Sequence, residues 1–169
     1  MTLRQPLHAL ALSCTLAFGV MSDASAAPAA CFLAPEELGK ALGRKFDPGV
    51  EEPGIGGTSC KYSSARHERH DRAVSVWLLT LPPGPSQDML RQMTAGGPKA
   101  SFEPVAGDPD GAARVRGGQD DQLADITYRR AGHVVFLRAL RADSEPDAKA
   151  RNARRAELEA ALLKLRRVP

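Results

Sequence analysis

The sequence predicts an α+β domain in which an antiparallel sheet of about five strands has helices packed on one face. Two observations predict the strands: residues 122–141 contain two alternating runs around a tight turn, and residues 72–81 are rich in β-branched and aromatic side chains. A third observation predicts a covering helix, because leucines recur at helical spacing near the carboxyl end. The elements follow in the order helix, two strands, helix, about three strands and helix, which favours an antiparallel arrangement.

The first predicted helix covers residues 34–43, "APEELGKALG". Pro35 suits the first helical turn, the two glutamates after it favour the positive end of the helix dipole, and Gly43 suits the helix end. Residues 44–57, with their prolines and glycines, predict a loop. The run "TSCKYSS" that comes next predicts the first strand.

The middle of the chain predicts a second helix and two short strands. After the strand at 72–81, prolines predict a break and Ser86 a helix cap. Met89, Leu90 and Met93 give this helix one apolar face. The residues from 102 to 115 then predict two short strands on either side of a Gly-Asp-Pro-Asp-Gly turn.

The hairpin within residues 122–141 has a definite predicted register, because its turn centres on Ala131 and Gly132. One face then carries only apolar pairs, which are Tyr128 with Val135, Ile126 with Leu137, and Ala124 with Ala139. The other face pairs Asp125 with Arg138 and Thr127 with Phe136. A slip of one residue would bury the two charged side chains, so we predict that the apolar face is the core face.

The last predicted helix lies within residues 146–168, and its apolar stripe is expected to cover the sheet. That stripe consists of Leu158, Ala161, Leu162 and Leu165. Basic residues alternate with Glu157 and Glu159 along the same helix, which predicts a solvated face rather than a surface for anionic lipid or glycan. The basic residues are Lys149, Arg151, Arg154, Arg155, Lys164, Arg166 and Arg167.

Residues 1–26 have the three parts of a secretory signal peptide: a positive start at Arg4, an apolar run, and an Ala-Ser-Ala cleavage motif. Cleavage would leave residues 27–169 as a single periplasmic or secreted domain with no membrane span. A membrane anchor is the alternative, but an apolar run of about 15 residues is shorter than the ~20 that a span needs. Lipidation of Cys14 instead of its removal also stays open, although the residues before it only loosely match a lipobox.

The cysteines predict a disulfide. Of the three, Cys14 leaves with the signal peptide, so the mature chain keeps Cys31 and Cys60. An even pair of cysteines in an exported chain favours a disulfide. A zinc or redox site is the alternative, but it is disfavoured because the two cysteines lack C-x-x-C spacing.

Four features together resemble a broad group of exported bacterial proteins. These features are a cysteine ahead of the helix "PEELGKALG", a glycine-rich turn into "TSCKY", the segment "AGDPDGAARV", and a final covering helix. The group includes small actinobacterial lipoproteins of unknown function whose α+β sandwich is similar to the PsbP-like fold. The resemblance implies that fold, an exported location and a binding or assembly role without catalytic residues. The lipobox of the actinobacterial members is missing, so the resemblance does not extend to a lipid anchor.

No catalytic signature occurs in the sequence, and we assign no catalytic residue, cofactor or metal ligand. His67, Glu68, His70 and Asp71 are of types that bind metals, but side chains at a hairpin tip converge poorly, so we predict a solvated turn. The formal net charge of +3 supports only a weak preference for anionic surfaces, and no nucleic-acid partner is expected.

Trp77, Leu79, Phe136 and Arg138 form a candidate partner face, because both sides of the strand at 72–81 are apolar. If helices cover one face only, these residues remain exposed on the other; coverage by a loop or helix is the favoured alternative. The expected function is a non-enzymatic binding module of the bacterial cell envelope that holds a protein or a small ligand. An inhibitor or immunity protein of a secreted hydrolase is the second candidate function.

Overall fold

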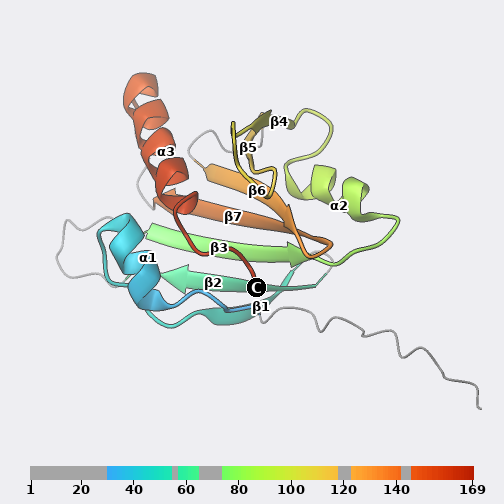
Figure 1. The fold of residues 1–169 in the computed structure, drawn as a ribbon. Coiled ribbons are helices and arrows are strands. Elements are labelled where there is room, and N and C mark those ends of the chain that lie inside the picture. The colour runs from blue at the N-terminus through green and yellow to red at the C-terminus, as the bar shows by residue number, and fades with distance from the viewer. Residues whose placement is uncertain (1–29, 55–56, 65–73, 118–122, 142–145) are drawn as a thin grey trace, which may run out of the picture.

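The computed structural model describes residues 30–54, 57–64, 74–117, 123–141 and 146–169. These residues form an α+β fold of one antiparallel sheet and three helices, shown in Figure 1. The helices are α1 (Pro35–Leu42), α2 (Gln87–Thr94) and α3 (Ala148–Leu162). The strands are β1 (Val50–Gly54), β2 (Gly57–Ser63), β3 (Val74–Leu81), β4 (Ser101–Pro104), β5 (Ala113–Arg116), β6 (Ala124–Arg130) and β7 (His133–Arg141).

The strands lie in the order β1-β2-β3-β7-β6-β5-β4, and every neighbouring pair is antiparallel. Strand β3 does not pair with the next strand in the chain. Instead the chain passes through α2 to the far edge of the sheet at β4 and returns by antiparallel neighbours until β7 lies beside β3 (Figure 1). The longest strands, β3 and β7, therefore meet at the centre of the sheet.

The sheet has seven strands in the described residues, so the expectation of about five was too low. The main difference is β1, which lies inside the predicted loop at residues 44–57. Its sequence, "VEEPG", has a low strand propensity, but Pro53 is tolerated because β1 is an edge strand. The opposite edge strand, β4, also carries a proline, Pro104. Proline removes a backbone donor and so disfavours pairing with another chain at both edges.

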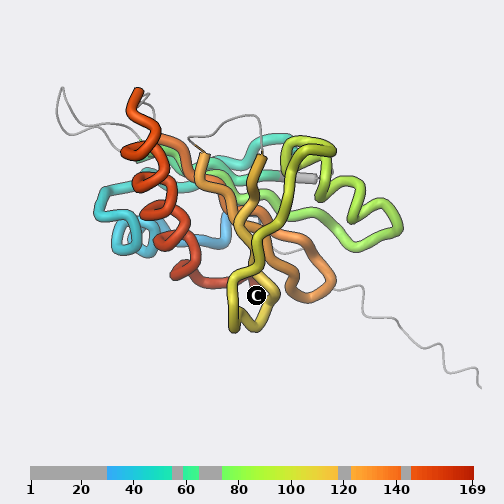
Figure 2. Tube along the Cα trace, turned by 90° about the horizontal axis from the view of Figure 1, so that it is seen from above, coloured from blue at the N-terminus to red at the C-terminus, as the bar shows by residue number. Residues whose placement is uncertain are grey.

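Helices cover both faces of the sheet, which corrects the prediction of helices on one face. On the first face, the larger apolar core lies between the sheet and the pair α1 and α3, and includes Leu38 and Leu162. On the second face, a smaller core includes Phe136 and packs against Leu90 of α2. Figure 2 gives the view from above, with α1 and α3 on one side and α2 on the other. Among the described residues, α2 and the residues that follow it are the part of the chain that packs on the second face.

The hairpin of β6 and β7 has the predicted register. Tyr128 lies opposite Val135, Ile126 opposite Leu137, and Ala124 opposite Ala139, and all six side chains belong to the first-face core. Ala131 at the turn has a positive φ of 47°, followed by Gly132 at 78°. Two positive φ values in succession are the geometry that a tight two-residue hairpin turn requires.

The ends of α1 follow the sequence signals, whereas the predicted cap Ser86 lies at the N-cap position of α2 but its side chain forms no capping hydrogen bond. Pro35 occupies the first turn of α1, and Gly43 ends the helix with φ 68°, in the left-handed region that glycine adopts without strain. At the start of α3, the side chain of Asp147 accepts a hydrogen bond of 2.7 Å from the backbone N–H of Ala150. These caps satisfy backbone groups that a helix end leaves without partners.

Two buried tyrosines of the first-face core form hydrogen bonds with the backbone near the two ends of the described chain. The hydroxyl of Tyr62 on β2 accepts a hydrogen bond of 3.1 Å from the backbone N–H of Leu33. The hydroxyl of Tyr128 on β6 accepts one of 3.2 Å from the backbone N–H of Val168. Both side chains are essentially inaccessible to solvent, so each hydroxyl satisfies a backbone donor that water does not reach.

We therefore expect Tyr62→Phe and Tyr128→Phe each to lower the free energy of unfolding by about 1–3 kcal/mol, since each leaves a buried N–H without an acceptor. Urea unfolding of the two variants measures this. Because the two hydroxyls hold opposite ends of the chain and share no partner, the effects in the double variant should add. An unchanged unfolding midpoint in either variant would show that its hydroxyl is not needed there.

Candidate functional site

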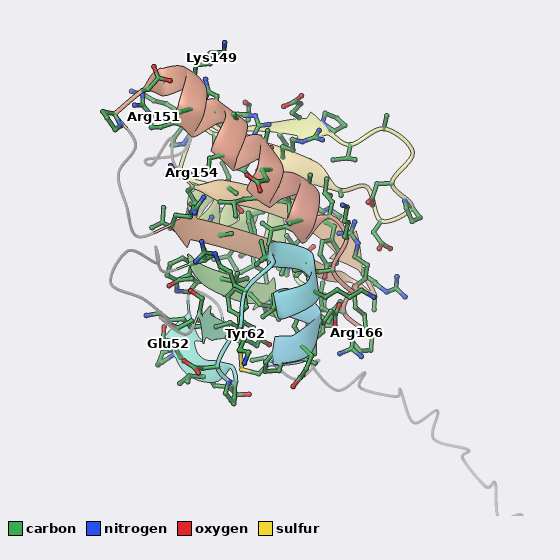
Figure 3. All side chains as sticks on the ribbon, turned by 90° about the vertical axis from the view of Figure 1, so that its left-hand side faces the viewer. Glu52, Tyr62, Lys149, Arg151, Arg154 and Arg166 are labelled. Carbon is green, nitrogen blue, oxygen red and sulfur yellow. A yellow bond between two sulfur atoms is a disulfide. The ribbon has the colours of Figure 1, made fainter. Side chains whose placement is uncertain are left out.

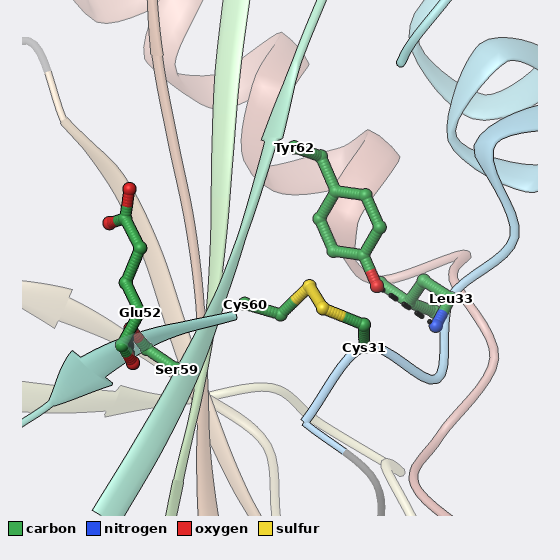
Figure 4. Close-up of a disulfide and its surroundings, with 6 residues drawn as sticks. All are labelled: Cys31, Leu33, Glu52, Ser59, Cys60 and Tyr62. Atoms are coloured by element: carbon green, nitrogen blue, oxygen red, sulfur yellow. Dashed lines mark hydrogen bonds between the residues drawn. A yellow bond between two sulfur atoms is a disulfide. The ribbon is translucent and has the colours of Figure 1, made fainter. Parts of the chain in front are cut away.

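The predicted disulfide between Cys31 and Cys60 is present, with the two Cα atoms 5.1 Å apart. Figure 4 shows how it joins the segment before α1 to β2, the strand that also carries Tyr62. Cys60 is fully buried in the first-face core. The disulfide and the bond from Leu33 to Tyr62 thus hold the same segment at two points.

Gly49 allows the chain to pass close to this disulfide. A Cβ atom at this position would lie 2.4 Å from Sγ of Cys60 and 2.6 Å from Cε1 of Tyr62. Real Cβ atoms do not approach other atoms so closely, so only glycine fits without displacement of the disulfide or the tyrosine ring. The close packing indicates that the role of this region is structural.

The candidate partner face contains one row of side chains that crosses five strands. Val50, Lys61, Trp77, Arg138 and Asp125 lie opposite one another in successive strands from β1 to β6. The row changes from open to covered along its length: Val50 is 61% exposed, whereas Asp125 is 4% exposed. Trp77 is half-buried at the centre of the row. The adjacent row contains Leu79, also half-buried, and Phe136.

The covered part of this face includes two of the four candidate partner residues, in agreement with the favoured alternative that a loop or helix covers them. Phe136 is fully buried in the second-face core beneath α2, so it offers no contact area. Arg138 donates hydrogen bonds to the carboxylate of Asp125 and to the backbone carbonyl of Thr94 at the end of α2. Its guanidinium is engaged in holding α2 to the sheet. Trp77 and Leu79 remain at the surface.

The methionines of α2 lie beside the uncovered part of the face. Arg91 stacks over the ring of Phe102 on β4, with its guanidinium carbon 3.8 Å from the ring centre. Residues turn by about 100° along a helix, so Met93 lies on the flank opposite Arg91. α2 also contacts β3, the strand that carries Trp77. Met89 and Met93 are 59% and 55% exposed, and of the predicted apolar face only Leu90 packs against the sheet.

We call the uncovered region the Trp77 surface. It consists of Val50, Lys61, Trp77, Leu79, Leu140, Met89 and Met93. Lys61 places its ammonium 5.9 Å from the centre of the Trp77 indole, and Leu140 lies diagonally next to Trp77 on the same face. Val50 was not among the predicted partner residues because it lies in the predicted loop. Lys61 was not among them because the sequence did not predict the register between β2 and β3.

Asp125 is a buried carboxyl group with an unusual environment. Both bonds from Arg138 end on Oδ2, at 2.9 Å and 2.8 Å, while Oδ1 has no donor among the described residues. Burial raises the pKa of Asp125 to about 6, because loss of hydration outweighs the attraction of Arg138. From the sequence we expected burial of Asp125 only after a register slip, but Asp125 is buried in the predicted register.

A second buried carboxylate, Glu159, lies on the opposite face. Arg116 on β5 binds it through both terminal nitrogens, at 2.5 Å and 3.0 Å, and Nε of Arg114 lies 3.4 Å away. Only 2% of the residue is exposed, so the prediction of a solvated position for Glu159 was wrong. Arg166 and Arg167 of the predicted solvated face are also paired, with Glu37 and Asp108.

The remaining candidate residues give no catalytic or metal centre within the described part of the chain. His67, Glu68, His70 and Asp71 lie outside the described residues, as do Cys14 and the whole predicted signal peptide. Among the residues that are described, no group of three or more His, Cys, Asp or Glu side chains could hold a metal ion. No helix in the described part of the chain is both long and apolar enough to cross a membrane.

Comparison with known proteins assigns the chain to no protein family. No family model, curated protein or solved structure matches it. A function for the chain must therefore be inferred from its own residues and their geometry.

Proposed function

We propose that this chain is an exported, non-enzymatic binding module of the bacterial cell envelope, and that it holds a protein partner through the Trp77 surface. We further propose that its fold belongs to the PsbP-like group. The support for the fold proposal is the sequence resemblance together with the α+β architecture and antiparallel sheet.

Two features support export. The first 26 residues have the composition of a secretory signal peptide. The second feature is the disulfide between Cys31 and Cys60, since disulfides persist in oxidising compartments such as the periplasm and the exterior of the cell. Cys60 is fully buried in the core, so the disulfide is a structural bond, and structural disulfides are rare in the cytosol.

The composition of the Trp77 surface carries the binding proposal. It combines a half-buried tryptophan with two exposed methionines and an exposed valine. Val50, Met89 and Met93 are the only large apolar side chains that are exposed in the described residues, and all three lie on or beside the second face. Aromatic residues and methionine are enriched where proteins meet, and methionine adapts its shape to a partner. We therefore expect the partner to present an apolar protein segment to the space between α2 and β2.

Site-specific photo-crosslinking in the cell envelope tests this function. A crosslinking amino acid in place of Lys61 should give one discrete adduct with a second protein. Trp77→Ser should weaken that complex about thirtyfold, since truncation of a central aromatic residue at an interface costs about 2 kcal/mol. The matched control is Leu163→Ala, which truncates a half-buried apolar side chain that packs on the opposite core. It should leave the adduct unchanged.

An adduct that survives Trp77→Ser, or that Leu163→Ala removes equally, would contradict the proposed site. The absence of any adduct from Lys61 would contradict it as well. If the partner is a secreted hydrolase whose activity falls on binding, the module is an inhibitor, the second function that we considered from the sequence.

A further inference from the structure

A cleft lies between α1 and α3, on the face of the sheet opposite the Trp77 surface. Its volume is about 550 Å³, within the range of small-molecule sites in proteins. The buried side chains of Val74, Leu158 and Ala161 form its apolar floor. The end of α1, from Lys40 to Gly43, forms one wall. Figure 3 shows α1 and α3 next to each other on this side of the molecule.

The described residues around this floor are strongly positive. Lys40, Arg44, Arg141 and Lys164 line the cleft, against a single carboxylate, Glu157. These cations come from three segments of the chain, which the fold brings together at one place: the end of α1, the end of β7 and the residues after α3. The carboxyl end of α1 adds a partial negative charge, but a helix end contributes only about half a unit. Arg44 and Arg141 have interactions of their own, so the positive charge offered to a ligand comes from Lys40 and Lys164.

The two lysines differ from the other cations near the helices. Arg116 is paired with Glu159, and Arg166 and Arg167 are paired with Glu37 and Asp108. By contrast, neither Lys40 nor Lys164 forms an ion pair with a carboxylate of the described residues. Both are exposed, so their ammonium groups are accessible to a ligand that enters the cleft. An anion placed between them would also reduce the repulsion between the two lysines.

We propose that this cleft binds a small anionic amphiphile, in which a carboxylate or phosphate group is joined to a short apolar chain. Lys40 and Lys164 bind the anionic group, and Arg141 adds to the positive potential around it. The apolar chain covers Val74, Leu158 and Ala161, which removes that floor from water. This site is independent of the proposed protein interface, because the two lie on opposite faces of the sheet.

Calorimetric titration of the purified disulfide-bonded protein tests the proposal with four probes below their micellar concentrations. Octyl phosphate and octanoate carry both the charge and the chain, octyl glucoside carries the chain alone, and inorganic phosphate carries the charge alone. We expect at least one of the two anionic amphiphiles to bind more tightly than both single-feature probes. Its dissociation constant should rise with ionic strength, and the headgroup that binds identifies the class of anion.

Paired variants connect binding to the lysines. Lys40→Gln combined with Lys164→Gln should weaken binding about tenfold or more, because both removed cations contact the anion. Lys149→Gln is the matched control, since this exposed lysine lies at the end of α3 far from α1 (Figure 3). The control should bind as the unchanged protein does. All three positions are exposed, so the thermal unfolding temperature should stay the same in both variants.

Three results would overturn the proposal. One is that neither anionic amphiphile binds at millimolar concentration. Another is that octyl glucoside or inorganic phosphate binds as tightly as the amphiphiles do. The third is that the double lysine variant retains full affinity. None of these results would affect crosslinking at Lys61, so failure here is distinguishable from failure of the proposed function.

Discussion

Replacement of both Cys31 and Cys60 by serine is expected to lower the free energy of unfolding by about 3.6 kcal/mol. The two cysteines are 29 residues apart in sequence, and the disulfide removes conformational freedom from the unfolded chain in proportion to the logarithm of that loop length. A polar serine hydroxyl at the fully buried position 60 should add to the loss. This is the largest effect that we expect to persist at every pH.

Urea unfolding of the oxidised protein, the reduced protein and the double serine variant measures this effect. Reduction and substitution should give similar unfolding midpoints, because both open the same loop. Gly49→Ala provides a comparison that leaves the bond in place but crowds it, and we expect a smaller loss of about 1–3 kcal/mol from the displaced disulfide and tyrosine ring. A double serine variant with the stability of the oxidised protein would contradict the structural role of the bond.

Removal of the guanidinium at Arg138 is expected to give an effect of similar size, but one that depends on pH. At pH 8 the change Arg138→Met leaves the buried carboxylate of Asp125 without its partner, which should cost about 3–5 kcal/mol. At pH 4 Asp125 is protonated in the folded protein, since its pKa is raised to about 6, so no unpaired charge is buried. The cost at pH 4 should therefore be much smaller.

The pH dependence of the unchanged protein has a definite sign. The folded pKa of Asp125 lies above its ordinary value of 3.8, so the folded state binds the proton more tightly than the unfolded state between these two values. The contribution of Asp125 to stability is therefore largest below about pH 4 and falls as the pH rises to about 6. The fall should be about 3 kcal/mol, at 1.36 kcal/mol for each unit of pKa difference.

Urea unfolding across pH 4–8 separates the contributions of Asp125 and Arg138 to stability. It is measured for the unchanged protein, Arg138→Met and Asp125→Asn. Asp125→Asn removes the titrating group, so the difference between it and the unchanged protein isolates Asp125 from the other carboxyl groups. In Arg138→Met the fall in stability should be larger and should extend to higher pH. An equal cost of Arg138→Met at pH 4 and pH 8 would show that Arg138 stabilises the fold by packing alone.

Local patterns in the sequence predicted the elements that depend on local rules. The hairpin register followed from the alternation between Ala124 and Ala139 around a turn that needs positive φ angles. The helix at Pro35 followed from its capping residues, and the disulfide followed from the cysteine count after removal of the leader. Each of these signals involves residues that are close in sequence or few in number, so few alternatives compete with it.

The features that the sequence did not predict depend on contacts between distant segments. Strand β1 forms only because β2 offers it an edge, since "VEEPG" has a low strand propensity of its own. The position of α2 on the second face depends on Leu90 and on the bond from Arg138 to Thr94, which no local pattern indicates. Burial of Asp125 and Glu159 follows from arginines more than ten residues away in the chain.

The candidate binding regions were predicted only in part, for the same reason. Alternation in β3 identified Trp77 and Leu79, but it could not show that α2 covers Phe136 while Trp77 stays half-buried at the surface. The cleft between α1 and α3 collects cations from three segments, and the sequence reveals such a cluster only when the fold is known. Lys164 was noted among the basic residues of the last helix, but nothing in the pattern separated it from the paired arginines beside it.

Intact-mass spectrometry of the native protein tests most directly whether the chain works outside the cytoplasm. The protein is kept free of reductant and is exposed to an alkylating reagent before the measurement. We predict a chain that begins at Ala27, carries no alkyl group, and has the mass of the form in which Cys31 and Cys60 are joined. A protein that retains Met1 to Ala26, or one in which both thiols are alkylated, would contradict export into an oxidising compartment.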